Sequence, residues 1–160
     1  NEGKVSGGYT SFHENGKTKA KYTRVGTSFE GDYFTWHWKG RLTKKCSYLN
    51  GKLHGDFMCF QSGYVTKCSY DNGKVSSVSC TYCDGKLVRE RHLDGKVDEY
   101  YPNGQFSVTY RPNKSIGDNF REVKRWYENG QIKESYSTQY GRKHGTHTSW
   151  SKDGKHCYKK

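Results

Sequence analysis

The sequence predicts an all-β fold, an elongated single-layer antiparallel β-meander of tandem hairpin repeats. Three observations predict it: a recurring aromatic residue, many glycine turns, and short strands with alternating side chains. The aromatic residue recurs at intervals of 24, 24, 22, 19, 26 and 23 residues, at Phe12, Trp36, Phe60, Tyr82, Tyr101, Tyr127 and Trp150. A period of this length is typical of a repeat architecture.

One complete unit lies between Phe60 and Lys74. It starts with the aromatic residue, turns at Gly63, continues as a polar strand that ends in Tyr70, and turns again after it. Asn-Gly and Asp-Gly pairs recur through the chain and suit tight hairpin turns, which need positive φ at both central residues. The pairs are Asn15-Gly16, Asn50-Gly51, Asn72-Gly73, Asp84-Gly85, Asp94-Gly95, Asn103-Gly104, Asn129-Gly130 and Asp153-Gly154. They leave little room for helix, and we expect roughly twelve to fourteen strands.

The chain is predicted to hold one repeat domain at residues 9–160. Residues 1–8, with three glycines, are expected to be a flexible lead-in. Residues 111–119 carry no pattern of their own and are predicted to be a loop insertion.

The composition limits the kind of core. Leu, Ile, Val and Phe together supply only 23 of 160 residues, but there are 14 tyrosines, 7 phenylalanines and 4 tryptophans. Each buried ring removes about 150–250 Å² from water, so we expect a thin aromatic seam rather than a thick core. No apolar run approaches the roughly 20 residues that a membrane-spanning helix needs.

Strand alternation predicts a register for the cysteines. Cys46 and Tyr48 share one face of their strand. A turn centred near Lys52 would place Tyr48 opposite Phe57 and Cys46 opposite Cys59, which predicts a Cys46–Cys59 disulfide. With Cys68 and Cys80 on the following strands, other pairings stay open.

Six cysteines in a small, weakly cored chain favour an oxidising compartment, so we expect a secreted protein. The alternative is a cytoplasmic protein whose reduced cysteines pack as small apolar residues. Asn113-Lys-Ser115 fits the N-glycosylation pattern.

The units resemble the MORN repeat in its variant form, and the resemblance covers nearly the whole chain. It is carried by Glu14-Asn-Gly-Lys17, Asn50-Gly-Lys-Leu-His-Gly55-Asp-Phe57, Asp71-Asn-Gly-Lys74, Tyr101-Pro-Asn-Gly-Gln105, Tyr127-Glu-Asn-Gly-Gln-Ile-Lys133 and Gly141-Arg-Lys-His-Gly145. It implies hairpins laid side by side in one sheet, and functions in scaffolding, self-association and partner binding. It also implies, from some bacterial relatives, an antitoxin or toxin-immunity role.

Catalysis and metal binding are not expected. The chain has no nucleophile elbow, phosphate loop or paired-carboxylate signature. Cys80-Thr-Tyr-Cys83 suggests a zinc half-site or a redox pair, but a second half-site is missing. The prediction is therefore a non-enzyme without cofactor or metal.

Two classes of function stay open. The first is a scaffold that associates with itself, through its end strands or through the seven recurring aromatic residues. The second is a module that binds an acidic protein or a polyanion. Net charge is +12, and four lysines each stand three residues before a strand tyrosine, which places them on the face opposite that tyrosine: Lys19, Lys45, Lys67 and Lys133.

Overall fold

The computed structural model describes residues 5–113, 116–117 and 119–160. These residues form sixteen strands and no helix, so the predicted all-β meander of successive hairpins is confirmed. They therefore contain no helix that is long and apolar enough to cross a membrane. The chain divides into two compact units, unit 1 (Asn1–Ser79) and unit 2 (Cys80–Lys160).

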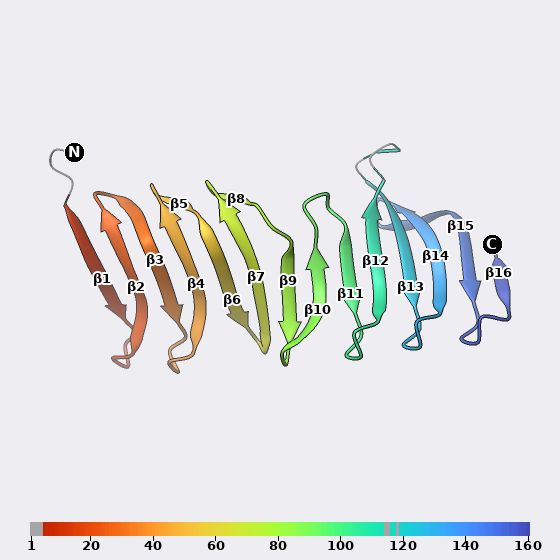
Figure 1. Cartoon of the computed structure of the whole chain (residues 1–160), viewed down its shortest axis with the longest axis horizontal. Coiled ribbons are helices and arrows are strands. Elements are labelled where there is room, and N and C mark those ends of the chain that lie inside the picture. Colours follow the sequence, from red (N-terminus) through yellow and green to blue (C-terminus); the bar gives the residue numbers. More distant parts are fainter. Residues whose placement is uncertain (1–4, 114–115, 118) are drawn as a thin grey trace. The chain divides into compact units, whose positions relative to one another are not determined.

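Unit 1 is an antiparallel meander in which neighbours in the sequence are neighbours in the sheet (Figure 1). Its strands are β1 (Ser6–Phe12), β2 (Thr18–Val25), β3 (Ser28–Trp36), β4 (Leu42–Leu49), β6 (Gly55–Gln61) and β7 (Tyr64–Asp71). Two short strands pair with the ends of longer ones, next to the turns that follow them: β5 (Lys52–Leu53) pairs with β4, and β8 (Lys74–Val75) pairs with β7.

The predicted lead-in at residues 1–8 is too long. Strand β1 begins at Ser6, and Gly7 and Gly8 pair with Arg24 and Thr23 of β2. Glycine adopts extended backbone without difficulty, so its presence did not prevent pairing in the ladder. Residues 1–4 lie outside the described residues.

Unit 2 is a second meander with the same kind of sheet. Its strands follow in chain order: β9 (Ser79–Cys83), β10 (Lys86–Arg91), β11 (Val97–Tyr100), β12 (Phe106–Pro112), β13 (Phe120–Trp126), β14 (Ile132–Gln139), β15 (Arg142–Trp150) and β16 (Cys157–Lys159). In the predicted loop at 111–119, Arg111 and Pro112 belong to β12, and residues 114, 115 and 118 lie outside the described part.

Two kinds of turn join the strands. The tight kind has positive φ at both central residues, as predicted for Asn50-Gly51, Asn72-Gly73 and Asp84-Gly85, and it also occurs at Ser62-Gly63 and Tyr140-Gly141. In the other kind only the glycine has positive φ, between 73° and 92°, and its N–H donates to the carbonyl three residues earlier; the glycines are Gly16, Gly40, Gly95, Gly104, Gly130 and Gly154.

Five of these six turns, all except the one at Gly40, were predicted to be tight as well, and that prediction was wrong. In Asn15-Gly16 and Asn103-Gly104 the asparagine keeps negative φ, since its side-chain oxygen accepts the N–H two residues later, 3.2 Å from Lys17 and 3.0 Å from Gln105. Such Asx turns compete with the two-residue hairpin turn for the same Asn-Gly sequence.

The predicted Cys46–Cys59 pairing is wrong because the register differs. Cys59 lies opposite Lys44, and Met58 lies opposite Lys45. Extra residues at His54 and Gly55 shift β6 against β4, and the His54 N–H donates to the Ser47 carbonyl at 3.0 Å. All six cysteines are free thiols.

The core is thin, as the composition predicted. Ala20, Cys46 and Val123 are the buried apolar residues of the described chain. On one face of unit 1 the rings of Tyr9, Tyr22 and Tyr33 stack in a row, with centroids 5.6 and 5.5 Å apart. The tyrosines cover one another, so that a single layer can shield apolar surface.

Candidate functional site

The recurring aromatic residues lie where strands end in turns. Phe12, Trp36 and Trp150 are the last residues of β1, β3 and β15. Tyr101 and Tyr127, however, are the first residues of turns, one position beyond the equivalent strand-end residues Tyr100 and Trp126. Of the seven predicted self-association residues, Phe12 is 60% exposed, and the other six, which include Phe60 and Tyr82, are half-buried.

Tyr101 and Tyr127 have a different role, which the sequence spacing did not reveal. The Tyr101 hydroxyl donates to the Trp126 carbonyl at 2.9 Å, and the Tyr127 hydroxyl donates to the Trp150 carbonyl at 2.9 Å. In unit 1, His13 Nε2 makes the corresponding contact with the Trp36 carbonyl at 2.9 Å. Each of these side chains ties one turn to the next hairpin.

The turn asparagines add a second tie between neighbouring hairpins. Asn15 Nδ2 donates to the Trp38 carbonyl at 2.8 Å, and Asn103 Nδ2 donates to the Glu128 carbonyl at 2.9 Å. Asn129 Nδ2 donates to the Lys152 carbonyl at 3.0 Å. These bonds repeat along unit 2 and also join the turns at residues 13–17 and 37–41 of unit 1, so they hold successive hairpins together at their turns.

The predicted lysine row exists in unit 1 with one change of member. The cross-strand register runs from Lys21 through Phe34, Lys45 and Met58 to Lys67. Lys19 falls at the register irregularity between β1 and β2 and has no place in this row. The prediction treated Tyr22 and Tyr48 as equivalent positions in successive repeats. In the sheet, however, Tyr22 lies in one cross-strand row with Tyr33 and Cys46, not with Tyr48.

Lys21, Lys45 and Lys67 are exposed, and each is two strands from the next. Strand spacing places successive lysine Cα atoms on the order of 10 Å apart. The Lys45 ammonium lies 5.9 Å from the centroid of the Phe34 ring. We call the cross-strand row of five residues the lysine row; its members are Lys21, Phe34, Lys45, Met58 and Lys67.

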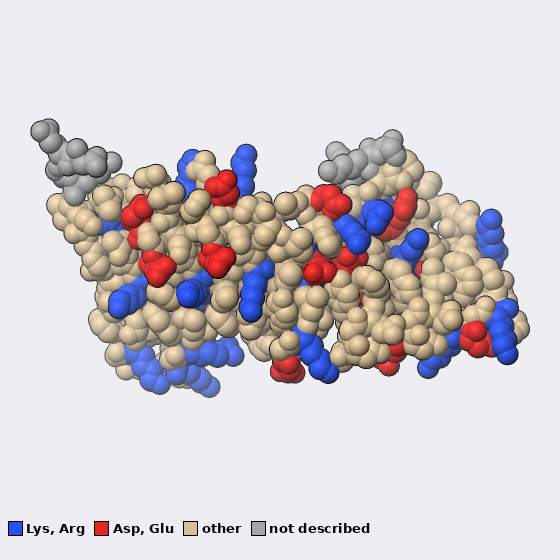
Figure 2. Space-filling model, in the orientation of Figure 1, with Lys and Arg blue, Asp and Glu red and all other residues tan. Residues whose placement is uncertain are grey.

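Two other rows flank the lysine row on the same face. Asp32 and Asp56 follow on one side and accept hydrogen bonds from Ser47 Oγ at 2.9 Å and Ser69 Oγ at 3.3 Å. On the other side, Trp36 stacks on Phe34 with centroids 5.9 Å apart. Figure 2 shows separate blue and red patches over the strands of unit 1. The face combines cations with accessible rings, and the acidic row bounds it.

Lys133, the fourth predicted lysine, lies in unit 2 on β14. It is exposed, and its ammonium is 5.5 Å from the centroid of the Tyr127 ring. It therefore contributes to the surface near the turn edge of unit 2 and is not a member of the lysine row.

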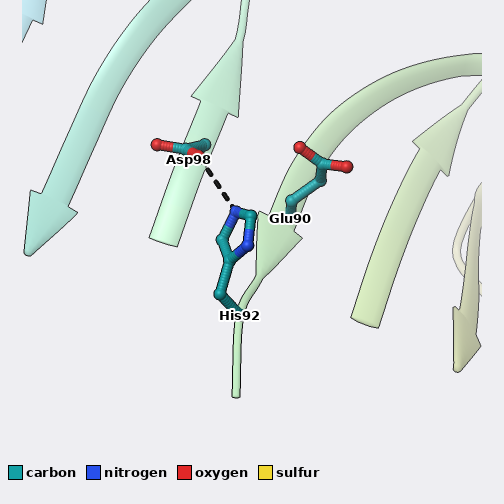
Figure 3. Close-up of side chains that lie close together, drawn as sticks. All are labelled: Glu90, His92 and Asp98. Atoms are coloured by element: carbon teal, nitrogen blue, oxygen red, sulfur yellow. Dashed lines mark hydrogen bonds and ion pairs between the residues drawn. The ribbon is translucent and has the colours of Figure 1, made fainter. Parts of the chain in front are cut away.

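A polar cluster in unit 2 was not predicted. Glu90 of β10, His92 of the following turn and Asp98 of β11 place one ligand-type atom each within 4.8 Å of one another (Figure 3). Glu90 and Asp98 are directly opposite in the ladder, where like charges repel. The only sequence signal was the charged strand itself, and charged residues are usually solvated.

The cluster resolves this repulsion with its own donors. Asp98, which is 2% exposed, lies 2.7 Å from the Lys96 ammonium and 3.0 Å from His92 Nε2, and it accepts the Thr109 hydroxyl at 2.9 Å. Burial raises the pKa of Asp98, but the hydrogen bonds from Lys96, Thr109 and His92 outweigh it and lower the pKa overall. Because an ammonium already neutralises Asp98, the cluster is a poor match for a metal cation.

Glu90 is engaged on the other side of the same cluster. The Tyr100 hydroxyl donates to its Oε2 at 2.5 Å, and the Cys80 thiol lies 3.8 Å from its Oε1. Burial, followed by the bond to Glu90, raises the pKa of Tyr100. The pKa of the Cys80 thiol is raised by burial and by the Glu90 charge. Raised pKa values make both groups weak nucleophiles at neutral pH.

The remaining predicted sites lie apart from this cluster. Cys46 is buried in unit 1, and burial raises the pKa of its thiol. Cys68 shares a face with Phe57, its partner in the register. Asn113 Nδ2 donates to Glu122 Oε1 at 3.1 Å, while the next two residues of the glycosylation pattern lie outside the described residues. Glycosylation of Asn113 stays a prediction.

The fold and the tied turns define a β-hairpin repeat protein. The family model of the MORN repeat variant matches residues 122–139, which include most of β13, the turn at 127–131 and all of β14. The chain is thus a protein with a MORN repeat of the variant type, as its sequence motifs indicated. No curated protein matches the chain.

Proposed function

We propose that the protein is a non-catalytic β-hairpin repeat scaffold that works by binding macromolecules, including other copies of itself. The observation that carries the proposal is the series of side-chain bonds between successive hairpins, such as Tyr127 to Trp150 and Asn129 to Lys152. These bonds stiffen an otherwise thin sheet. A stiff sheet with half-exposed rings is suited to presenting a surface, and partners would add the burial that the fold lacks.

Self-association is the first form of this function. Phe12 ends β1, and Trp38 lies in the turn between β3 and β4 at the same edge of unit 1; they are 60% and 53% exposed. Rings of this size, left largely in water, favour contact with a second copy. Sedimentation across a range of concentrations tests this, because the average mass of the wild type should rise with concentration.

Replacing both rings, in Phe12→Ser with Trp38→Ser, should lower the tendency to associate. Tyr140→Ser is a suitable control, because Tyr140 is 74% exposed but belongs to unit 2 and not to this edge of unit 1. A wild-type chain that stays monomeric at every concentration would remove self-association from the proposal.

Polyanion binding is the second candidate, and the lysine row favours it. Three exposed lysines at regular spacing, separated by Phe34 and Met58, match a linear chain of negative charges. Neutralising such a chain releases counterions, so binding should weaken steeply with salt. An acidic protein surface, including that of a protein toxin, would meet the same groups.

Retention on immobilised heparin tests this second candidate. Lys45→Gln with Lys67→Gln should elute earlier and with a shallower salt dependence than the wild type. Lys52→Gln with Lys74→Gln removes the same charge from exposed positions outside the row. Equal losses in the two double variants would mean that net charge, not the row, holds the polyanion.

The register also distinguishes two single variants. Lys21→Gln should weaken heparin retention more than Lys19→Gln, because only Lys21 belongs to the row. Secretion stays a prediction, and the free cysteines no longer support it, since the expected disulfide is absent from the described chain.

A further inference from the structure

One face of unit 2 contains a pocket that neither proposed function uses. Its volume is about 430 Å³, and its lining includes Arg89, Arg91, Val97, Glu99, Tyr110 and Arg121. This volume falls within the range of pockets that hold small molecules. The pocket is open to solvent and is formed by described residues alone.

The register explains why these side chains meet. Arg91 of β10 pairs with Val97 of β11, and Val97 pairs with Tyr110 of β12, so the three share one face. Arg121 of β13 pairs with Pro112, two residues along from Tyr110, and so lies on the same face. Val97 and Tyr110 form an apolar floor between the two arginines, while Asp98 points to the opposite face.

The charge of the pocket is not balanced. Arg89 Nε and Nη2 both donate to Glu99 Oε1, at 3.0 and 2.7 Å, so this pair is neutral. Lys96, also at the rim, is engaged with Asp98. Arg91 and Arg121 are exposed, and neither guanidinium has an ion pair within the part of the chain that the structure describes. Two positive charges therefore face a partly apolar pocket.

We propose that this pocket binds a small phosphate monoester that carries an aromatic ring. A phosphate monoester has a charge of about −1.5 to −2 at neutral pH, which matches the two unpaired guanidinium groups. Guanidinium binds phosphate oxygens through two parallel hydrogen bonds, which gives geometric selectivity as well as charge. The ring of the ligand packs on Tyr110 and Val97, which offer the apolar contact that an inorganic anion would not use.

Titration of the wild-type protein with phenyl phosphate, followed by ¹H–¹⁵N NMR, tests the proposal. Saturable shifts should be confined to β10 through β13. Inorganic phosphate should bind more weakly because it lacks the ring, and benzoate should bind more weakly because it carries a single charge. Lowering the pH below about 6 should weaken the binding of phenyl phosphate more than that of benzoate, because the phosphate group takes up a proton in this range.

The decisive variant is Arg91→Gln with Arg121→Gln, which should lower the affinity for phenyl phosphate at least about tenfold. Its control is Arg111→Gln with Lys124→Gln, which removes two exposed charges from the opposite face of β12 and β13. The control should bind like the wild type. Because all four side chains are exposed, both variants should fold, and their spectra report it.

Three outcomes would overturn the proposal. The first is no saturable binding of phenyl phosphate to the wild type at about 10 mM. The second is an equal loss in the two double variants, which would show attraction by net charge alone. The third is shifts centred outside β10 to β13. Each outcome leaves the scaffold function untouched, because that function rests on the turn bonds and on unit 1.

Discussion

The hydroxyl of Tyr127 donates to the carbonyl of Trp150, 23 residues further along the chain, at 2.9 Å. This distance in sequence is one repeat, and Tyr101 makes the same bond to Trp126 with a separation of 25 residues. A backbone carbonyl at a strand end beside a turn has no further ladder partner, so a side chain from the preceding repeat supplies the donor. Successive hairpins of unit 2 are thus held at both their strands and their turns.

Tyr127→Phe should lower the free energy of unfolding by about 1 kcal/mol, because it removes one hydrogen bond and leaves the Trp150 carbonyl without its donor. Urea denaturation compares the variant with the wild type. Tyr140→Phe provides the control, since that side chain is 74% exposed and should tolerate the change. If both variants lost the same stability, the bond to Trp150 would have no special role.

Much of the fold could be predicted because hairpin turns and strand alternation are local. Asn50-Gly51 and Asn72-Gly73 are tight turns, as their sequence indicates. The register was predicted less well, because the extra residues at His54 and Gly55 shift β6 against β4. The recurring His-Gly pair was interpreted only as part of a turn, although a register shift also accompanies His144-Gly145 between β14 and β15. That shift separates Cys46 from Cys59 and invalidates the predicted disulfide.

The candidate sites depended on the register and were predicted less well. Lys45 and Lys67 lie in the lysine row, but the row includes Lys21 in place of Lys19. Lys19 is the extra residue at the register irregularity between β1 and β2, whereas Lys21 pairs with Phe34. The pocket of unit 2 was missed altogether. Arg91 and Arg121 are 30 positions apart in the sequence, and only the pairing of four strands brings them to one face.

Asp98→Asn should destabilise the protein by about 2 kcal/mol at pH 7, because it removes the charge that pairs with Lys96 inside the sheet. The folded-state pKa of Asp98 is lowered, so its contribution is present above the unfolded pKa of about 3.9 and is lost as pH falls through the folded pKa. The difference between variant and wild type should therefore shrink below about pH 4.

Urea denaturation at pH 7 and at about pH 3 measures this difference. Asp94→Asn is the matched control, because Asp94 is exposed and asparagine occupies the corresponding position in the turn at Asn15. A difference between Asp98→Asn and wild type that stayed constant with pH would show that the carboxylate charge is not what stabilises the cluster.

Gly95→Ala should be more destabilising than Gly104→Ala, although both glycines have similar backbone, with φ of 89° and 83°. An alanine at either position costs about 1–2 kcal/mol for the left-handed backbone. At Gly95 the new Cβ would also lie 3.0 Å from Pro112 Cγ, whereas nothing lies within 4 Å at Gly104. Thermal unfolding of the two variants separates backbone strain from the clash, and equal melting temperatures would argue against the Pro112 contact.

The cysteines should react with a thiol reagent in an order set by burial. Cys157 is exposed and should be modified first, while Cys46, which is 1% exposed and whose pKa is raised by burial, should react only when the protein unfolds. Mass spectrometry of the native protein after timed alkylation, followed by digestion, follows each site. The protein should contain six free thiols, and a reductant should leave its melting temperature unchanged. A mass two hydrogens lower than that of the reduced chain would reveal a disulfide. A disulfide between Cys46 and Cys59 in particular would require β4 and β6 to adopt a register other than the one that pairs Lys44 with Cys59.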